Sequence, residues 1–477
     1  QLLLAVLLLK KAGRQGLARR LLGDLMNQHP LCVDAVLNLV DTLFAQRRYT
    51  DALTLTQWSH RSLPHHHEVL SRGVKAAHCL GDFVALRQFH DFAPSEYTAY
   101  HQLWSQVYHV DTTLQHIREH ATNLFDEYRP RRERLRTPNA RKERPIVALV
   151  GTYLHPMFLA PLLASVDRNR IEIHLYTNDV RATQFWDGQT FRMDNKTPSN
   201  MAQNIAERDT DVLIEMTGSY FGIELLKERP ARRQGFWIAQ EFSKQASFCD
   251  FVFADQHLIP SALRSQWSEE VLEVPIWAPF AFYGLPEQRE TTPLARNWDH
   301  TFGVCQRMLK FNDTMLEAWS SILNSVPNSG IIMKDRSFGC PIFRHHFSQR
   351  LTSHGFDPKS FILEADSPHP EYFDYHRRID VSLDTFPYGG GITTAECLGM
   401  GVPVVTLAGD LAASRLAASY VSSLGHPEWV ATTVDDYCEL AASLVKDSVA
   451  LNNFKRHHRS KIAESTLQNH RAFAESF

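Results

Sequence analysis

Three consecutive glycines, residues 389–391, form the stretch of the chain best suited to hold a phosphate group. They follow an apolar run that ends at Leu383, and two hydroxyl side chains, Thr393 and Thr394, come soon after them. Glycine lets a backbone approach a ligand closely, and the first N–H groups of a helix present the positive end of its dipole to an anion. Thr393 or Thr394 can cap such a helix. The loop would then connect a parallel strand to this helix at the carboxyl end of the strand, where open α/β sheets bind ligands. The pattern therefore predicts a phosphate site, although a plain strand-to-helix turn has the same composition.

Two other side chains follow apolar runs of the same kind and can supply a proton or a charge. His155 comes after residues 146–151, and an imidazole can position a substrate or exchange a proton near neutral pH. Lys310 comes after residues 301–304, and its ammonium group can neutralise a phosphate that leaves during a reaction. An exposed turn histidine and a solvated lysine are the alternative interpretations.

Apolar runs alternate with amphipathic segments from Pro145 onward, and this alternation predicts the elements that position these residues. The expected strands are residues 146–151, 171–176, 211–216, 236–238 and 251–253 in a first series, and residues 301–304, 330–333, 361–363, 379–383 and 402–407 in a second. A proline-rich stretch, residues 275–293, separates the two series. Two parallel-sheet domains in tandem predict an α/β protein with a cleft between the domains. The last helix, after about residue 450, is expected to return to the first sheet.

The first hundred residues repeat with a period of 34. The phased positions are Gly13, Arg47 and Gly81 in one set, Ala18, Ala52 and Leu86 in a second, and Pro30 and Pro64 in a third. Small residues at helix contacts and a closing proline are typical of tetratricopeptide repeats, whose stacked helix pairs form a concave peptide-binding surface. Arg47 departs from the pattern, because the first and third copies have glycine at that position. The alternative is a helical cap on the α/β domains.

The composition of the whole chain excludes several classes of protein. With 477 residues there is room for two to four domains, and a formal net charge of −3 argues against a broad nucleic-acid surface. The seven cysteines are scattered without a Cys-x-x-Cys pair, which fits a reducing cytoplasm. The apolar run at residues 1–9 ends at two lysines and is too short to span a bilayer. No initiator methionine is present, so we expect residue 1 to lie inside a longer natural chain.

Two patterns imitate metal sites, and neither is expected to bind a metal. His116 and His120 have the spacing of a zinc-binding helix, but no third ligand is evident in the sequence. Asp209 and Asp211 imitate an Asp-x-Asp motif, but they precede a predicted strand instead of following one. We therefore expect no metal cofactor.

Residues 383–410, followed by residues 413–419, resemble the nucleotide-sugar signature of the O-linked N-acetylglucosamine transferase family. Members of that family join tetratricopeptide repeats to a GT-B glycosyltransferase of two Rossmann-like domains, and this chain looks like a divergent bacterial-type member. The resemblance covers most of residues 145–450, more strongly in the second domain, and implies a UDP-sugar donor with no bound metal. It supports His155 and Lys310 as catalytic residues. The residues that it places at the donor are Arg307, Lys310, Ser367, His369, Tyr372, Gly390, Gly391, Thr393, Thr394 and Glu396.

The resemblance also implies roles within this set. The backbone of Ser367 and His369 is expected beside the uracil, with Tyr372 nearby. The two threonines are expected to contact the diphosphate, and Glu396 is expected to accept hydrogen bonds from the ribose hydroxyls. Tyr372 as a core aromatic, and Glu396 as a charge that compensates a helix dipole, are the alternatives.

The chain departs from the family at three places. Arg307 stands where the family usually carries an amide side chain, and residues 391–393 stand where it often has His-Thr-Thr. Residues 239–245 replace the Gly-Tyr-Pro-Gly loop that approaches the acceptor. The acceptor-side candidates in this loop are Gln240, Glu241 and Lys244. The acceptor and the sugar are therefore both open.

These observations predict four regions and one favoured function. The regions are tetratricopeptide-like helical repeats at 1–110, a helical and basic linker at 111–144, an N-terminal Rossmann-like acceptor-side domain at 145–290, and a C-terminal Rossmann-like nucleotide-sugar-binding domain with a returning terminal helix at 291–477. We expect a cytoplasmic glycosyltransferase that moves a sugar, N-acetylglucosamine first, from UDP to serine or threonine of a polypeptide presented by the repeats. The alternatives are transfer to asparagine, transfer of glucose or another sugar, a small-molecule or glycan acceptor, and a non-catalytic repeat scaffold with a decayed transferase site.

Overall fold

The computed structural model describes residues 14–28, 33–62, 66–92, 95–126, 142–151, 154, 156–194, 196–238, 240–282 and 298–477. The chain divides into two compact units, Gln1–Tyr108 with Gly303–Tyr372, and His109–Phe302 with Phe373–Phe477. Within the described ranges, no helix combines the length and the apolar run that crossing a bilayer requires.

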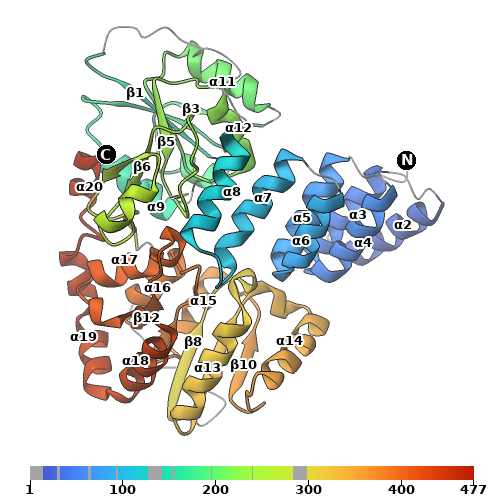
Figure 1. Cartoon of the computed structure of the whole chain (residues 1–477), viewed down its shortest axis with the longest axis vertical. Coiled ribbons are helices and arrows are strands. Elements are labelled where there is room, and N and C mark those ends of the chain that lie inside the picture. Colours follow the sequence, from blue (N-terminus) through green and yellow to red (C-terminus); the bar gives the residue numbers. More distant parts are fainter. Residues whose placement is uncertain are drawn as a thin grey trace. The chain divides into compact units, whose positions relative to one another are not determined.

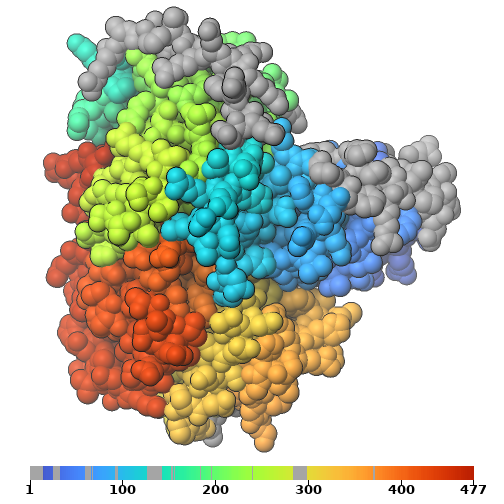
Figure 2. All heavy atoms as spheres, viewed as in Figure 1, coloured from blue at the N-terminus to red at the C-terminus, as the bar shows by residue number. Residues whose placement is uncertain are grey.

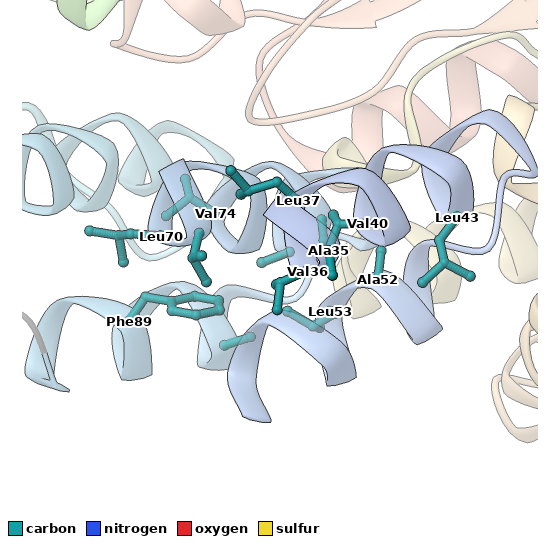
Figure 3. Close-up of a cluster of buried hydrophobic side chains, with 14 of the residues drawn as sticks. Ala35, Val36, Leu37, Val40, Leu43, Ala52, Leu53, Leu70, Val74 and Phe89 are labelled. Carbon is teal, nitrogen blue, oxygen red and sulfur yellow. The ribbon is translucent and has the colours of Figure 1, made fainter. Parts of the chain in front are cut away.

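From residue 14 onward, the described part of the first unit opens with six helices that pack in chain order, each against the next (Figure 1). They are α2 (Gln15–Gln28), α3 (Val33–Ala45), α4 (Tyr49–Ser62), α5 (His67–Leu80), α6 (Phe83–Phe92) and α7 (Glu96–Ser105). Helices α2, α4 and α6 begin at a constant step of 34 residues, which is the period of the sequence. Their apolar faces form one buried core; its labelled members in Figure 3 are Ala35, Val36, Leu37, Val40, Leu43, Ala52, Leu53, Leu70, Val74 and Phe89.

The same unit contains the first strands of a second sheet and the helices beside them. These are the end of β8 (His300–Val304), then α13 (Asp313–Ser325), β9 (Ser329–Lys334), α14 (Pro341–Ser353), β10 (Phe361–Glu364) and the start of α15 (His369–His376). Strands β9 and β10 pair in parallel. Helix α13 begins where the Asn312 side chain accepts the N–H of Met315 at 3.0 Å, and it buries Met315, Trp319 and Ile322 on one face.

The repeat position that Arg47 and Gly81 share falls in turns that contact this sheet. Gly81 ends α5 with a left-handed φ of 67°, and Arg47 takes a φ of 57° at the same phase after α3. A side chain is disfavoured in this region, yet Arg47 Nη1 forms a salt bridge with the Asp366 carboxylate after β10. Gly81 instead packs closely, since a Cβ there would lie 3.3 Å from the backbone of Leu309. Both turns therefore join the helical repeats to loops of the sheet.

The second unit contains a seven-stranded sheet with the order β3-β2-β1-β4-β5-β6-β7, in which all neighbouring strands pair in parallel. Its strands are β1 (Ile146–Val150), β2 (Glu172–Tyr176), β3 (Thr190–Phe191), β4 (Val212–Glu215), β5 (Arg233–Phe236), β6 (Phe251–Ala254) and β7 (Glu270–Glu273). The helices of this part are α8 (Leu114–Asp126), α9 (Pro156–Ser165), α10 (Val180–Thr183), α11 (Pro198–Glu207) and α12 (Tyr220–Lys227). The strand order reverses between β1 and β4, the place where such sheets usually bind ligands.

The second sheet has six strands in the order β10-β9-β8-β11-β12-β13. Its remaining elements are β11 (Val381–Leu383), α16 (Ile392–Gly399), β12 (Val404–Leu407), α17 (Leu416–Ser423), β13 (Val430–Ala431), α18 (Val434–Lys446), α19 (Ser448–Glu464) and α20 (His470–Ser476). The terminal helix α20 packs on α9, and the Phe473 ring stacks on Trp237 with centroids 5.4 Å apart. The C-terminal helix therefore covers the first sheet.

The strand pattern read from the sequence matches the structure with one shift and three omissions. Residues 236–238 were expected as a strand, but β5 ends at Phe236 because Ile238 has a φ of 71° and cannot continue an extended backbone. The sequence did not indicate β3, β7 or β13. Strands β3 and β13 have only two residues each, and both ends of β7 are exposed glutamates.

Candidate functional site

The glycine loop follows β11 and is held by one buried carboxylate. Asp384, the first residue after β11, is 1% exposed. Its Oδ1 accepts the N–H of Gly390 at 2.8 Å, and its Oδ2 accepts the hydroxyl of Thr406 in β12 at 2.8 Å. The Thr385 hydroxyl donates to the Tyr388 carbonyl at 2.8 Å. These bonds fix the loop at the ends of two strands. The sequence alone did not single out Asp384, although a carboxylate directly after a buried strand is a usable signal.

Helix α16 begins directly after the glycine loop, and its first turn carries both predicted threonines. Its N-cap is Gly391 and has no side-chain cap, so the prediction that Thr393 or Thr394 caps this helix is wrong. Both threonines lie inside the first turn because the helix already begins at Ile392. Thr394 is 2% exposed, and its hydroxyl oxygen has no hydrogen-bond partner among the described residues. Uncapped helical N–H groups beside an unpartnered hydroxyl suit an anion such as a diphosphate.

Glu396 lies one turn further along α16 than Ile392 and is 5% exposed. A glutamate buried this deeply is too enclosed to serve only as a solvated dipole-compensating charge. Its placement near the start of the helix is compatible with the predicted hydroxyl-binding role, which stays a prediction.

The two predicted cations of the first unit follow β8 and have different surroundings. Lys310 ends a short 3-10 helix, η3 (Met308–Lys310), is 9% exposed, and donates from Nζ to Gln306 Oε1 at 3.0 Å. Arg307 precedes this helix and is exposed. Asp335 steadies the loop, because its Oδ2 accepts the N–H of Met308 at 3.3 Å. A positioned, largely buried lysine is suited to meet an anionic group, and Arg307 lines a cavity described below.

The predicted uracil-binding stretch follows β10 in the same unit. The hydroxyl oxygen of Ser367 is buried and has no partner among the residues that the structure describes. His369 begins α15, and its side chain lies outside the described residues. Tyr372 is half-buried, with the Cys305 thiol donating to its Oη at 3.4 Å. The loops after β8 and β10 therefore meet at Cys305 and Tyr372.

The three acceptor-side candidates differ in what they contact. Glu241 Oε1 accepts the Tyr388 hydroxyl at 3.1 Å, which joins this loop to the glycine loop. Gln240 is 1% exposed and donates to a backbone carbonyl of β6 at 3.1 Å. Lys244 is 1% exposed, with its Nζ 3.9 Å from the centroid of the Phe242 ring. Gln240 and Lys244 thus support the loop from inside, and Glu241 is the candidate nearest to the glycine loop.

A second buried carboxylate ends β4, next to β1. Glu215 is 1% exposed and accepts the N–H of Thr217 at 3.1 Å and of Gly218 at 2.7 Å. Burial raises the pKa of this carboxyl group to about 7, and its hydrogen bonds lower the pKa only in part. His155, expected in the loop after β1, lies outside the described residues. Glu215 was not among the residues predicted for this edge from the sequence.

The two metal-like patterns have ordinary structural surroundings. Asp209 takes a φ of 57° in the turn between α11 and β4, and Lys142 Nζ lies 2.8 Å from Asp209 and 3.1 Å from Asp211. His116 is exposed on α8. Over the described part of the chain, no three potential metal ligands come together.

Comparison with solved structures identifies the fold. A single-residue variant of the O-GlcNAc transferase from Thermobaculum terrenum aligns with 100% of this chain and 95% of that chain, with a TM-score of 0.86 and 20% sequence identity. The protein therefore has a GT-B fold, with two Rossmann-like domains after an all-α helical region.

Residues 300–477 match the model of glycosyl transferase family 41. The chain is 31% identical over 282 residues to the probable UDP-N-acetylglucosamine–peptide N-acetylglucosaminyltransferase SPINDLY of Petunia hybrida, covering 58% of this chain and 30% of that protein. It is 30% identical over 348 residues to the SPINDLY protein of Eustoma exaltatum, covering 68% of this chain and 37% of that protein. The chain thus spans about a third of the length of the curated relatives it matches.

Proposed function

We propose that the protein transfers a sugar, N-acetylglucosamine first, from a UDP-sugar to serine or threonine side chains of a polypeptide. The observation that carries this proposal is the glycine loop inside the family 41 region. There Asp384 holds the loop, α16 begins without a side-chain cap, and the Thr394 hydroxyl is unpartnered among the described residues. The names of the Petunia and Eustoma relatives support the same donor and a peptide acceptor.

In the proposed reaction, the acceptor hydroxyl oxygen bonds to the anomeric carbon while the bond from that carbon to the UDP oxygen breaks. The bonding electrons leave with the diphosphate, and the hydroxyl proton passes to a base, for which His155 is the predicted residue. Lys310 and the N–H groups of α16 are the predicted donors to the departing diphosphate. Donors already in position stabilise the developing charge without rearrangement, so the proposal includes no metal.

The finer assignments belong to the same proposal. The helical region is a tetratricopeptide-like array, supported by the constant 34-residue step between α2, α4 and α6. A cytoplasmic location is supported by the six described cysteines, all of which are free. We propose the same four regions as before, with boundaries at 1–110, 111–144, 145–290 and 291–477.

The donor is tested by measuring UDP release from the purified chain with a panel of UDP-sugars, with GDP-sugars as a control for the base. We expect turnover of UDP-N-acetylglucosamine that EDTA leaves unchanged. Lys310→Ala should abolish UDP binding in calorimetry, whereas Lys359→Ala, an exposed lysine of the same unit, should not alter it. Turnover of a different sugar would change the donor, and loss of turnover in EDTA would contradict the metal-free mechanism.

The acceptor is tested on polypeptides labelled with the donor sugar. Alkaline β-elimination releases sugars from serine and threonine but not from asparagine, so release of the label is the expected result. Label that resists alkali and is removed by an amidase would indicate asparagine. If neither UDP binding nor turnover occurs, the enzyme proposal fails and a non-catalytic repeat scaffold is the better explanation.

A further inference from the structure

A cavity of about 400 Å³ lies inside the first unit, between the helical repeats and two loops of the adjoining sheet. Figure 2 shows the blue surface of these helices resting on the yellow and orange surface of the sheet region of this unit. The side chains that matter here are Lys75 and His78 from α5, Tyr97 and His101 from α7, and Arg307 and Arg336 from the loops after β8 and β9. The volume is within the range of pockets that bind small ligands or single side chains.

The cavity carries an excess of positive charge. Lys75, Arg307 and Arg336 are exposed, and within the described ranges none of them has a hydrogen bond or a salt bridge. The one carboxylate of the lining, Asp335, is already engaged. Its Oδ1 accepts the N–H of Ser337 at 2.7 Å, and its Oδ2 accepts a second backbone N–H at 3.3 Å. Lys75 Nζ lies over the Phe44 ring, 5.0 Å from its centroid. The two guanidinium groups are therefore available to a ligand of opposite charge, and Lys75 adds positive charge beside them.

Aromatic and imidazole groups form the more buried part of the lining. Burial lowers the pKa of His78 to about 4 and that of His101 to about 3, so both rings are neutral at pH 7. The Nε2 atom of His78 is buried and has no hydrogen-bond partner in the described structure. The Tyr97 ring packs edge-on against His101, with centroids 4.5 Å apart. A buried polar atom without a partner is costly, which indicates that a ligand or water meets His78.

We propose that this cavity binds an oxyanion carried by a polypeptide side chain, either a phosphorylated residue or a carboxylate. Guanidinium groups bind phosphate and carboxylate through paired hydrogen bonds. A neutral imidazole can add a further hydrogen bond, and the wall of repeat helices is the kind of surface that binds extended polypeptides. That this polypeptide is the acceptor of the transferred sugar rests on the proposed function. That the cavity binds an oxyanion does not.

The test uses the full chain and three fluorescent peptides that differ only at one central residue, which is serine, glutamate or phosphoserine. Binding is followed by fluorescence anisotropy, with inorganic phosphate as a competitor. We expect the phosphoserine peptide to bind about tenfold more tightly than the serine peptide, with the glutamate peptide between them. Equal binding of the three peptides, or no binding of any, would overturn the proposal. Competition by phosphate without a preference for the phosphoserine peptide would also overturn it, in favour of a site for free anions.

Two variants connect the binding to the cavity. Arg336→Gln should remove most of the tenfold preference, and Lys75→Gln should reduce it less, because a lysine lacks the paired donors of arginine. Arg87→Gln is the matched control, an exposed cation on α6 of the same helical region that does not line the cavity. All three side chains are exposed, so folding should be unaffected. An Arg336→Gln protein that keeps the preference would contradict the proposal.

The outcome can be separated from that of the proposed function. Arg307 is also a predicted donor residue, so it is left unchanged, and UDP binding is measured on Arg336→Gln by calorimetry. Unchanged UDP binding with a lost phosphopeptide preference is the expected result. If the wild-type chain turns over a UDP-sugar but binds the phosphoserine and serine peptides equally, only the proposal of an oxyanion site is wrong. If the chain prefers the phosphoserine peptide but binds no UDP, only the proposal of a transferase is wrong.

Discussion

Two central strands, β4 and β11, each end in a buried carboxylate, and the two carboxylates hold their loops differently. Within the described part of the chain, the Glu215 carboxylate accepts hydrogen bonds only from residues two and three positions further along. Asp384 instead reaches Gly390, six residues on, and Thr406 on the neighbouring strand. The β4 loop is therefore held by a local turn, whereas the shape of the glycine loop depends on a bond between strands.

Two glycines near these carboxylates, Gly222 in α12 and Gly391 at the start of α16, also differ. A Cβ on Gly222 would lie 2.4 Å from the Glu215 carboxyl group, so this glycine is needed for packing. A Cβ on Gly391 would lie 3.4 Å from the Trp277 ring, which is an ordinary contact. The β4 edge has no spare room at Gly222, and a Cβ on Gly389 would lie 3.0 Å from Asp384 Oδ2. At Gly391, however, the glycine loop keeps space that the fold itself does not require. Free space bordered by N–H donors is what a ligand needs.

Loss of Asp384 should have the largest effect. Asp384→Ala leaves the Gly390 N–H and the Thr406 hydroxyl buried without a partner, so we expect a loss of about 4 kcal/mol in the free energy of unfolding and no measurable UDP binding. Thr406→Val removes only one of the two bonds and should cost about 1 kcal/mol with UDP binding retained. Urea unfolding and calorimetry measure both quantities. Normal UDP affinity in Asp384→Ala would show that the loop does not need this carboxylate.

Glu215 should make the stability of the β4 edge depend on pH. Its folded pKa of about 7 is above the ordinary value of 4.5, so between these values the folded state binds more protons than the unfolded state. The free energy of unfolding therefore falls as the pH rises through this window. Glu215→Gln removes the titration, so the stability of wild type relative to this variant should decrease by about 2–3 kcal/mol from pH 5 to pH 8. A difference that is constant with pH would place the pKa of Glu215 near its ordinary value.

Methyl groups added at Gly222 of α12 and at Gly391 should separate stability from binding. Gly222→Ala forces a methyl against a carboxylate that hydrogen bonds hold in place, and we expect a loss of about 2 kcal/mol in the free energy of unfolding. Gly391→Ala should leave stability within about 0.5 kcal/mol and weaken UDP binding about tenfold, because the methyl occupies the space left for the ligand. If Gly391→Ala binds UDP normally, the diphosphate does not approach the loop at this residue.

The smallest effect should come from the contact between the glycine loop and the acceptor-side loop. Tyr388→Phe removes one hydrogen bond, from Tyr388 to Glu241 at 3.1 Å, and should cost about 1 kcal/mol. Donor hydrolysis should stay within about twofold of wild type, since Asp384 still holds the loop. A loss of UDP binding as large as that of Asp384→Ala would mean that Glu241 controls the shape of the glycine loop as strongly as Asp384.

Local patterns in the sequence predicted the elements well, and the contacts between distant residues less well. The 34-residue period predicted where α2, α4 and α6 begin, because helix pairing depends on residues close in sequence. The role of Asp384 could not be derived in this way, because its partner Thr406 lies on another strand. Arg47 looked like a degenerate repeat position, and only its salt bridge to Asp366 explains it.

The turns at Arg47 and Gly81 also determine where the helical array can change in length. They are one repeat apart, and each touches a different loop of the sheet, at Asp366 and at Leu309. A helix pair inserted between them would separate two contacts that depend on the 34-residue step. A pair added ahead of α2 would leave both contacts intact. The helical array can therefore be lengthened ahead of α2, but it cannot be lengthened between these two turns without breaking a contact to the sheet.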